Sequence, residues 1–298
     1  MQGLSTHAKG FLLTLIGVIV LTPDTLLIRL ANMDVWQMTF WRGALMSATL
    51  LLTLAIIYRK DFFNRIFAIG KTGIIIAFML ALNSLTFVLS LEYASVAKVL
   101  VIIAITPMLA ALMSFFFLKE DVKRSTWAAI VISFIGIAIV VSDDLFKTNG
   151  GGNIWASVYP FLTALGLAGA FTLTRSKPEI NMVPATALNG LMIALLLLPF
   201  VWPLQIAAPQ VLPILGIGLF ILPLSFGLLA LGPRYISAPE VGLLLLLETC
   251  LGPLWVWVVL EEEPSTTVII GGFIVVITLA CHAAWSLHQN HKSNKISL

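Results

Sequence analysis

Three charged residues stand inside long apolar stretches of this sequence: Asp24, Arg42 and Glu248. Apolar stretches of about 18 residues or more are typical of helices that span a bilayer. An ionised side chain at the centre of such a helix costs about 2.5–3.5 kcal/mol, so these residues usually face a cavity or a partner. We therefore take them as the first candidates for binding or proton-transfer chemistry.

Asp24 and Arg42 are predicted to lie at the same depth in adjacent helices. Asp24 lies about six residues before the loop that joins the two helices and Arg42 about seven residues after it, which puts both roughly 9–11 Å deep. Two interpretations follow. Either a buried ion pair locks the helix hairpin, or Arg42 binds an anionic or carboxylate group while Asp24 holds it or titrates against it. Pro23 predicts a kink just before Asp24, of structural or functional meaning.

Glu248 lies about eight residues into the predicted helix 239–260, near the midplane of a membrane. A carboxyl group at that depth could carry a proton. The alternative is a neutral carboxyl that only hydrogen-bonds a neighbouring helix. Gly252 and Pro253 follow within two turns, and we expect them to bend the helix and expose Glu248 to a cavity.

Several uncharged residues are further candidates for a substrate site. Asn83 and Tyr159 supply hydrogen-bonding groups within apolar spans, although most such groups join helices and contribute about 0.6 kcal/mol each. Trp41, Trp255 and Trp257 lie deep enough in their predicted helices to line a cavity.

The composition requires these residues to be positioned inside a membrane. Of the 298 residues, 59% are hydrophobic and 10% are charged, whereas soluble domains carry about 25% charged residues. We expect an all-α integral membrane protein. Ten transmembrane helices are predicted near 11–30, 35–57, 72–91, 96–118, 125–142, 154–174, 183–204, 210–231, 239–260 and 266–286.

The basic residues predict how the chain is oriented. With both termini in the cytoplasm, thirteen of the 17 Lys and Arg residues fall on the cytoplasmic side. Arg29, Lys98 and Lys147 fall on the outer side, and Arg42 lies within a helix. This asymmetry is what the positive-inside rule predicts, so we expect a multi-pass protein of the cell's inner, cytoplasmic membrane.

The sequence contains a weak internal repeat. A shift of 142 positions superposes Tyr93 on Tyr235 and Ser95 on Ser237. Because each copy has five helices, an odd number, the second must enter the membrane from the opposite side. We predict two inverted five-helix halves, 1–149 and 150–298.

Lys98 and Glu240 occupy equivalent positions in the two copies, and therefore opposite faces of the membrane. One interpretation makes them gate or vestibule charges. The other is ordinary snorkelling of side chains at the interface.

Other classes of site have little support. Three of the four histidines, His7, His288 and His291, lie in the tails, and the sequence has no His-Glu-x-x-His motif. Cys250 and Cys281 lie in apolar segments. We expect no metal, no cofactor and no enzyme activity, and the formal charge of +3 is too small to indicate a nucleic-acid partner.

Three motifs resemble those of a known family. They are Phe40-Trp41-Arg42-Gly43, the run from Thr106-Pro107 to Leu118-Lys119-Glu120, and Leu247-Glu248-Thr249 followed by Gly252-Pro253-Leu254-Trp255. Over its whole length the chain resembles the drug/metabolite transporter superfamily, specifically its ten-helix EamA-domain members. Such members usually have Leu-Gly-Glu where this chain has Leu118-Lys119-Glu120 and Leu260-Glu261-Glu262.

The resemblance implies a secondary transporter that moves a small organic metabolite, amino-acid-like or otherwise polar or amphipathic, by alternating access across the cytoplasmic membrane. Its partners would be the small-molecule substrate and the lipid bilayer. Proton coupling, exchange and uniport are all compatible with the resemblance, and oligomeric state is open. The alternatives are a flippase for a lipid-linked substrate, a channel or, with less support, a membrane-embedded enzyme.

Overall fold

The fold is known from a computed structural model, which describes residues 6–119, 128–129, 131–133, 135–136, 138–139 and 153–296. All regular elements in these residues are helical. The α-helices are α1 (Thr6–Leu21), α2 (Asp24–Ala31), α3 (Val35–Tyr58), α4 (Phe62–Phe67), α5 (Gly70–Tyr93), α6 (Val96–Ile103), α7 (Thr106–Met113), α9 (Trp155–Arg175), α10 (Val183–Val201), α11 (Ala208–Leu215), α12 (Leu222–Leu231), α13 (Ala238–Leu244), α14 (Leu246–Leu260) and α15 (Thr266–Ile296). Short 3₁₀ turns (Arg59–Asp61, Gly232–Arg234) and π-helical segments (Ser114–Leu118, Gly216–Ile221) extend some of them.

Eight helical segments in the described part of the chain are long and apolar enough to cross a membrane. They are His7–Ala31, Val35–Phe67, Gly70–Tyr93, Val96–Leu118, Trp155–Arg175, Val183–Val201, Ala208–Arg234 and Ala238–Leu260.

Two further predicted spans complete the comparison. The span 125–142 falls largely outside the described residues, and those of its residues that are described are helical. The span 266–286 coincides with the first part of α15, in which an apolar helix covers Thr266–Thr278. The total of ten therefore stays a prediction.

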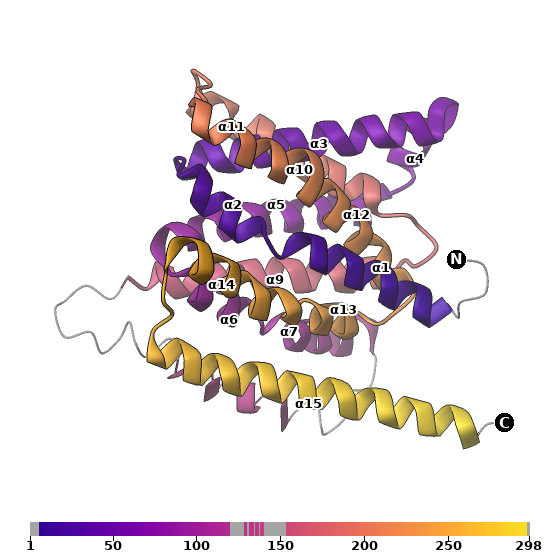
Figure 1. Ribbon diagram of the computed structural model, residues 1–298. Coiled ribbons are helices and arrows are strands. Elements are labelled where there is room, and N and C mark those ends of the chain that lie inside the picture. Colours follow the sequence, from indigo (N-terminus) through magenta and orange to yellow (C-terminus); the bar gives the residue numbers. More distant parts are fainter. Residues whose placement is uncertain are drawn as a thin grey trace.

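The outer surface of the helix bundle is apolar. Side chains such as Leu212, Val258, Phe117 and Phe220 are more than 70% exposed. A water-soluble protein rarely exposes apolar surface so widely, whereas hydrocarbon chains solvate it without cost. This distribution is that of a multi-pass membrane protein. The start of α1 and the end of α15 lie on the same side of the bundle (Figure 1).

The two halves of the chain pack against each other in a reciprocal pattern. Helix α5, in the third span, packs on α9, the first span of the second half, and α12 packs in the corresponding way on α1. Helix α3 packs on α10. These pairings agree with a two-fold relation that exchanges the first and second halves.

Helices α3 and α10 approach closely because each contributes a glycine to the contact. A Cβ atom on Gly43 would lie 2.9 Å from the carbonyl oxygen of Gly190, and one on Gly190 would collide with the carbonyl oxygen of Gly43. Small residues at such crossings let two backbones touch within a membrane.

The fourth and ninth spans pack against each other in opposite directions. Helix α6 contacts α14, and α7 contacts α13, so that the first part of each span meets the last part of the other. Gly242 packs on Pro107, and Thr249 Oγ1 donates to the carbonyl of Leu100 over 3.3 Å. The shift of 142 positions converts each of these contacts into the other, which supports an inverted repeat.

The ends of these two spans match as well. The side chain of Ser95 caps α6 by accepting from the backbone N–H of Lys98, and that of Ser237 caps α13 by accepting from Glu240. At the far ends, Lys119 and Glu261 both adopt a left-handed backbone with φ 57°. Glycine adopts this conformation without a steric cost, which gives a physical reason for the Leu-Gly-Glu pattern that the family resemblance implies at these two positions.

Three spans are interrupted near the middle of their length. The first breaks at Pro23, as predicted, and separates α1 from α2. The fourth breaks at Ala104, between α6 and α7, and the ninth at Leu245, between α13 and α14. Helix α14 continues through Gly252 and Pro253, so the bend predicted at these two residues stays a prediction.

Candidate functional site: a central pocket

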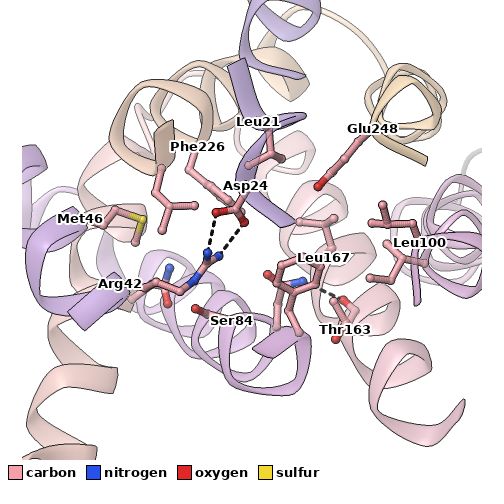
Figure 2. Close-up of a pocket in the computed structure, with 15 residues that line it drawn as sticks. Leu21, Asp24, Arg42, Met46, Ser84, Leu100, Thr163, Leu167, Phe226 and Glu248 are labelled. Atoms are coloured by element: carbon pink, nitrogen blue, oxygen red, sulfur yellow. Dashed lines mark hydrogen bonds and ion pairs between the residues drawn. The ribbon is translucent and has the colours of Figure 1, made fainter. Parts of the chain in front are cut away.

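A pocket lies at the centre of the bundle where the interrupted helices meet. Its cavity volume is about 50 Å³, and both halves of the chain line it. The charged lining residues are Asp24, Arg42 and Glu248 (Figure 2). The polar uncharged lining residues are Asn83, Ser84, Thr163 and Asn189, and the remainder of the wall is apolar.

Asp24 and Arg42 form a buried, bidentate ion pair. Arg42 Nη1 donates to Asp24 Oδ1 over 2.6 Å, and Nη2 donates to Oδ2 over 2.9 Å. The two residues are 1% and 3% exposed. Their equal depth in adjacent helices is predicted from the sequence, and the structure brings their side chains together.

The local folding of helix one and the ring of Phe87 position this ion pair. The break at Pro23 places Asp24 in the first turn of α2, where the partial positive charge of a helix N-terminus favours a carboxylate. The Arg42 guanidinium carbon lies 5.7 Å from the centre of the Phe87 ring, close enough for a cation–π interaction.

Glu248 faces the pocket from the opposite half of the chain. It lies in the first turn of α14, three residues after the break at Leu245, and is 9% exposed. Figure 2 shows its carboxylate pointing into the pocket from a helix other than those that hold the ion pair. Among the described residues, no side chain or backbone group donates a hydrogen bond to that carboxylate.

The uncharged polar residues of the pocket differ in how far they are satisfied. Asn83 Nδ2 donates to the carbonyl of Thr163 over 3.0 Å, and the hydroxyls of Thr86 and Thr163 lie 2.8 Å apart. These bonds join α5 to α9. Asn189 is 2% exposed, and its Oδ1 has no hydrogen-bond partner in the described structure.

A polar contact joins the two halves at the end of α2, which is the outer end of the bundle in the predicted orientation. Arg29 Nε lies 3.5 Å from Glu262 Oε2, and Arg29 Nη2 donates to the carbonyl of Ala94 over 2.9 Å. The backbone N–H of Val96 donates to Glu262 Oε1 over 3.1 Å. We call Arg29 and Glu262, with these two backbone partners, the outer latch. It joins the two halves.

Comparison with known proteins agrees with this architecture. The profile of the EamA-like transporter family matches the chain twice, over residues 8–142 and 152–282. The chain belongs to the EamA-like transporter family. The predicted half boundary at 149/150 falls between the two matches and outside the described residues, and stays a prediction.

The other comparisons add the fold. No curated protein matches the chain. A solved structure titled only "Crystal structure of protein" is similar, with a TM-score of 0.70 and 14% identity over 93% of this chain and 97% of that chain. At that identity the likeness concerns the fold alone.

Family membership makes the chain a membrane transporter of small solutes. That agrees with the expectation that the chain is not an enzyme. Among the described residues, no three His, Cys, Asp or Glu side chains gather as ligands of a metal would.

The predicted aromatic residues do not line the pocket of this EamA-like chain. Tyr159 stacks on Trp155, with ring centres 5.3 Å apart, near the beginning of α9. Trp41 packs edge-on against the neighbouring Phe40 ring. Their assignment to the substrate site stays a prediction.

Helix α14 turns its tryptophans away from the pocket. Trp255 and Trp257 are each 46% exposed, and Trp255 Nε1 donates to Thr22 Oγ1 over 3.3 Å. This hydrogen bond joins α14 to the break between α1 and α2. Trp255 therefore stabilises helices that surround the pocket without lining it.

Lys98 and Glu240 also lie outside the pocket lining. Lys98 is buried in the first turn of α6, at 5% exposure. Glu240 completes the cap of α13 with Ser237 and lies 3.2 Å from His7 Nε2. Both hold equivalent places next to a helix cap, and a gating role for them stays a prediction.

Sequence reasoning missed the apolar wall and the outer latch. Leu21, Met46, Phe87, Leu167 and Phe226 line the pocket but look like any other apolar residue in the sequence. The latch had a signal, since Arg29 was one of few bases predicted on the outer side and Glu262 lies in an acidic cluster.

Proposed function

We propose that this chain is a secondary transporter that moves a small polar or amphipathic organic solute through the central pocket by alternating access. The observation that carries the proposal is the pocket itself. Asp24, Arg42 and Glu248 come from both halves of the chain and surround one cavity in an otherwise apolar bundle. Transporters with inverted repeats have their substrate sites at this place.

The size of the cavity supports a cycle with more than one conformation. One water needs about 10–15 Å³ of such volume, so a cavity of about 50 Å³ holds a few waters. An organic solute needs a wider pocket. The halves must therefore move apart on one side or the other to admit it.

The outer latch is a suitable barrier for that movement. Its two charged side chains are 30% and 29% exposed, and ion pairs of this kind contribute only about 0–1 kcal/mol. A contact of that strength opens on the timescale of a transport cycle. The breaks at Pro23, Ala104 and Leu245 are places at which the interrupted helices can bend.

Each charged residue has a separate role in this proposal. The Asp24–Arg42 pair forms a fixed polar wall, and Glu248 is the group that meets the solute or a coupling proton. The protein lies in the cytoplasmic membrane with both termini in the cytoplasm. A reporter active only in the cytoplasm, fused after Leu298, should be active, and loss of its signal with intact expression would contradict this orientation.

Transport by sealed proteoliposomes tests the proposal. A broad panel of radiolabelled metabolites is offered to vesicles with the wild type, Arg42→Gln or Glu248→Gln, and with Glu92→Gln as a control because Glu92 is exposed at the end of α5. We expect a solute that the wild type and the control transport and the two pocket variants transport slowly. Transport that the pocket variants leave unchanged would refute passage through this pocket, and movement of lipid-linked compounds alone would favour a flippase.

A further inference from the structure

Acidic groups outnumber basic groups in the lining of the pocket. Of the residues that line it in the described structure, Arg42 is the only base, and Asp24 and Glu248 are the two acids. Both terminal nitrogens of Arg42 are occupied by the two oxygens of Asp24. The guanidinium group of Arg42 therefore pairs with Asp24, and the carboxyl group of Glu248 has no basic partner among the lining residues.

A second group in the pocket also lacks a donor. Asn189 Oδ1 is buried and accepts no hydrogen bond in the described structure. A buried acceptor without a partner has lost its hydrogen bonds to water and has gained none within the protein. It therefore favours a ligand with an N–H or O–H group. The carboxyl group of Glu248 and the amide oxygen of Asn189 therefore both favour a ligand that donates hydrogen bonds.

The other donors in the lining do not reverse this preference. Ser84 Oγ and Asn189 Nδ2, which have no hydrogen bond in the described structure, are neutral groups. Arg42 Nε has no partner, but its charge is shared with the part of the guanidinium that Asp24 neutralises. It offers one hydrogen bond to a neutral oxygen. Lys98, on the neighbouring helix α6, is buried but does not line the pocket.

The apolar residues of the pocket wall indicate the chemical character of the rest of the ligand. Leu21, Met46, Phe87, Leu167 and Phe226 supply apolar surface, including two aromatic rings. An apolar or aromatic group next to a positive charge would match both the wall and the unpaired acid.

We infer that the solute of this pocket is a small organic cation, an amine with an apolar body whose ammonium group pairs with Glu248 and donates to Asn189. The inference rests on the proposed function and adds the class of substrate. It differs from the sequence-based interpretation in which Arg42 receives an anionic group, because Arg42 is already paired.

A series of probes with one shape and four charge states tests the inference. Phenethylammonium is the cation, phenylalanine the zwitterion, 2-phenylethanol the neutral molecule and 3-phenylpropionate the anion. Binding to the purified full-length protein in detergent is measured by equilibrium dialysis. We expect the cation to bind at least about 10-fold more tightly than the alcohol, since one charge-assisted hydrogen bond easily supplies that factor, and the anion to bind most weakly.

Two variants locate the effect. Glu248→Gln should weaken binding of the cation about 10-fold and leave the alcohol unchanged, while Glu92→Gln should change neither. The comparison of probes on the wild type needs no variant, so a folding defect in Glu248→Gln would leave it intact.

The possible results separate this inference from the proposed function. Tightest binding of the anion or the zwitterion, or no difference among the four probes, would overturn the cation inference. The transport proposal would then still stand if the panel in proteoliposomes yields a solute whose transport depends on Arg42 and Glu248. Transport that is independent of both residues would refute passage through the pocket, whatever the probes do.

Discussion

Removal of one member of the Asp24–Arg42 pair should cost far more than removal of both. The two hydrogen bonds of 2.6 and 2.9 Å join side chains that are almost fully buried. Breaking such a pair leaves an uncompensated charge and costs about 3–5 kcal/mol. Asp24→Asn and Arg42→Gln should each show this loss, and the double variant should lose less than either single variant.

Thermal unfolding in detergent measures the three variants. At about 2–4 °C per kcal/mol, a loss of about 3–5 kcal/mol lowers the midpoint by roughly 6–20 °C. We expect an interaction energy of at least about 2 kcal/mol from the cycle of two single variants and one double variant.

The outer latch supplies a matched control with the same kinds of atoms. Arg29 and Glu262 are about one-third exposed and lie 3.5 Å apart, so the cycle of Arg29→Gln and Glu262→Gln should give less than about 1 kcal/mol. Additive effects of Asp24→Asn and Arg42→Gln, or equal interaction energies for the two pairs, would refute our account of the buried pair. A double variant that folds but does not transport would show a role beyond stability.

Three further predictions concern the pocket, the latch and the packing of the halves. Glu248→Gln, which keeps the size of the side chain but cannot titrate, should give reduced or pH-altered transport with an unfolding midpoint close to that of the wild type; wild-type transport over the whole pH range would leave Glu248 as a packing group. Arg29→Gln should increase labelling of Ser84→Cys from the outside by about 5-fold, the equivalent of about 1 kcal/mol from a part-exposed ion pair, and unchanged labelling would mean that the latch does not hold the outer end closed. Gly190→Ala should destabilise the protein by about 1–3 kcal/mol, because its Cβ would collide with the carbonyl of Gly43; Gly227→Ala, whose Cβ would meet its nearest neighbour at 3.7 Å, is the control, and equal losses would contradict the reasoning.

The helical spans could be predicted from the sequence because the thickness of a bilayer fixes their length. The predicted helices 35–57 and 96–118 agree closely with the spans Val35–Phe67 and Val96–Leu118, apart from the short helix that extends the former. The Asp24–Arg42 pair followed from depth alone, since two opposite charges at one level of adjacent helices have few other partners. The fold class and the family were therefore within reach of sequence reasoning.

The direction in which each side chain points could not be predicted. A membrane helix is apolar on the side that faces lipid and on the side that faces its neighbours, so its sequence shows little periodicity. Trp255 and Glu248 illustrate this, because both were assigned to the cavity by depth. Only Glu248 faces it, while Trp255 is half exposed and bonds to Thr22.

The position of the break in the ninth span also depended on tertiary contacts. Pro253 removes one backbone hydrogen bond, yet α14 continues through it, as neighbouring helices can compensate for a proline in a membrane. Gly252 instead allows close packing against Leu100. The ninth span is instead interrupted at Leu245, and leucine is not a residue type that marks a helix break.

Access to the pocket from the two sides of the membrane tests the central claim most directly. Ser84 lines the pocket, and Ser84→Cys in a chain with Cys250→Ala and Cys281→Ala gives a single thiol there. Membrane-impermeant thiol reagents are applied to oriented sealed vesicles, either outside or enclosed. Alternating access predicts that the thiol at position 84 reacts from both sides and that a transported solute protects it. In a second experiment, residues 29 and 262 are cross-linked through Arg29→Cys and Glu262→Cys, the first reagent is removed, and position 84 is then probed with a second label. The cross-link should abolish the reaction from the outside only. A thiol that reacts from one side alone under all conditions, or that no solute protects, would contradict the claim.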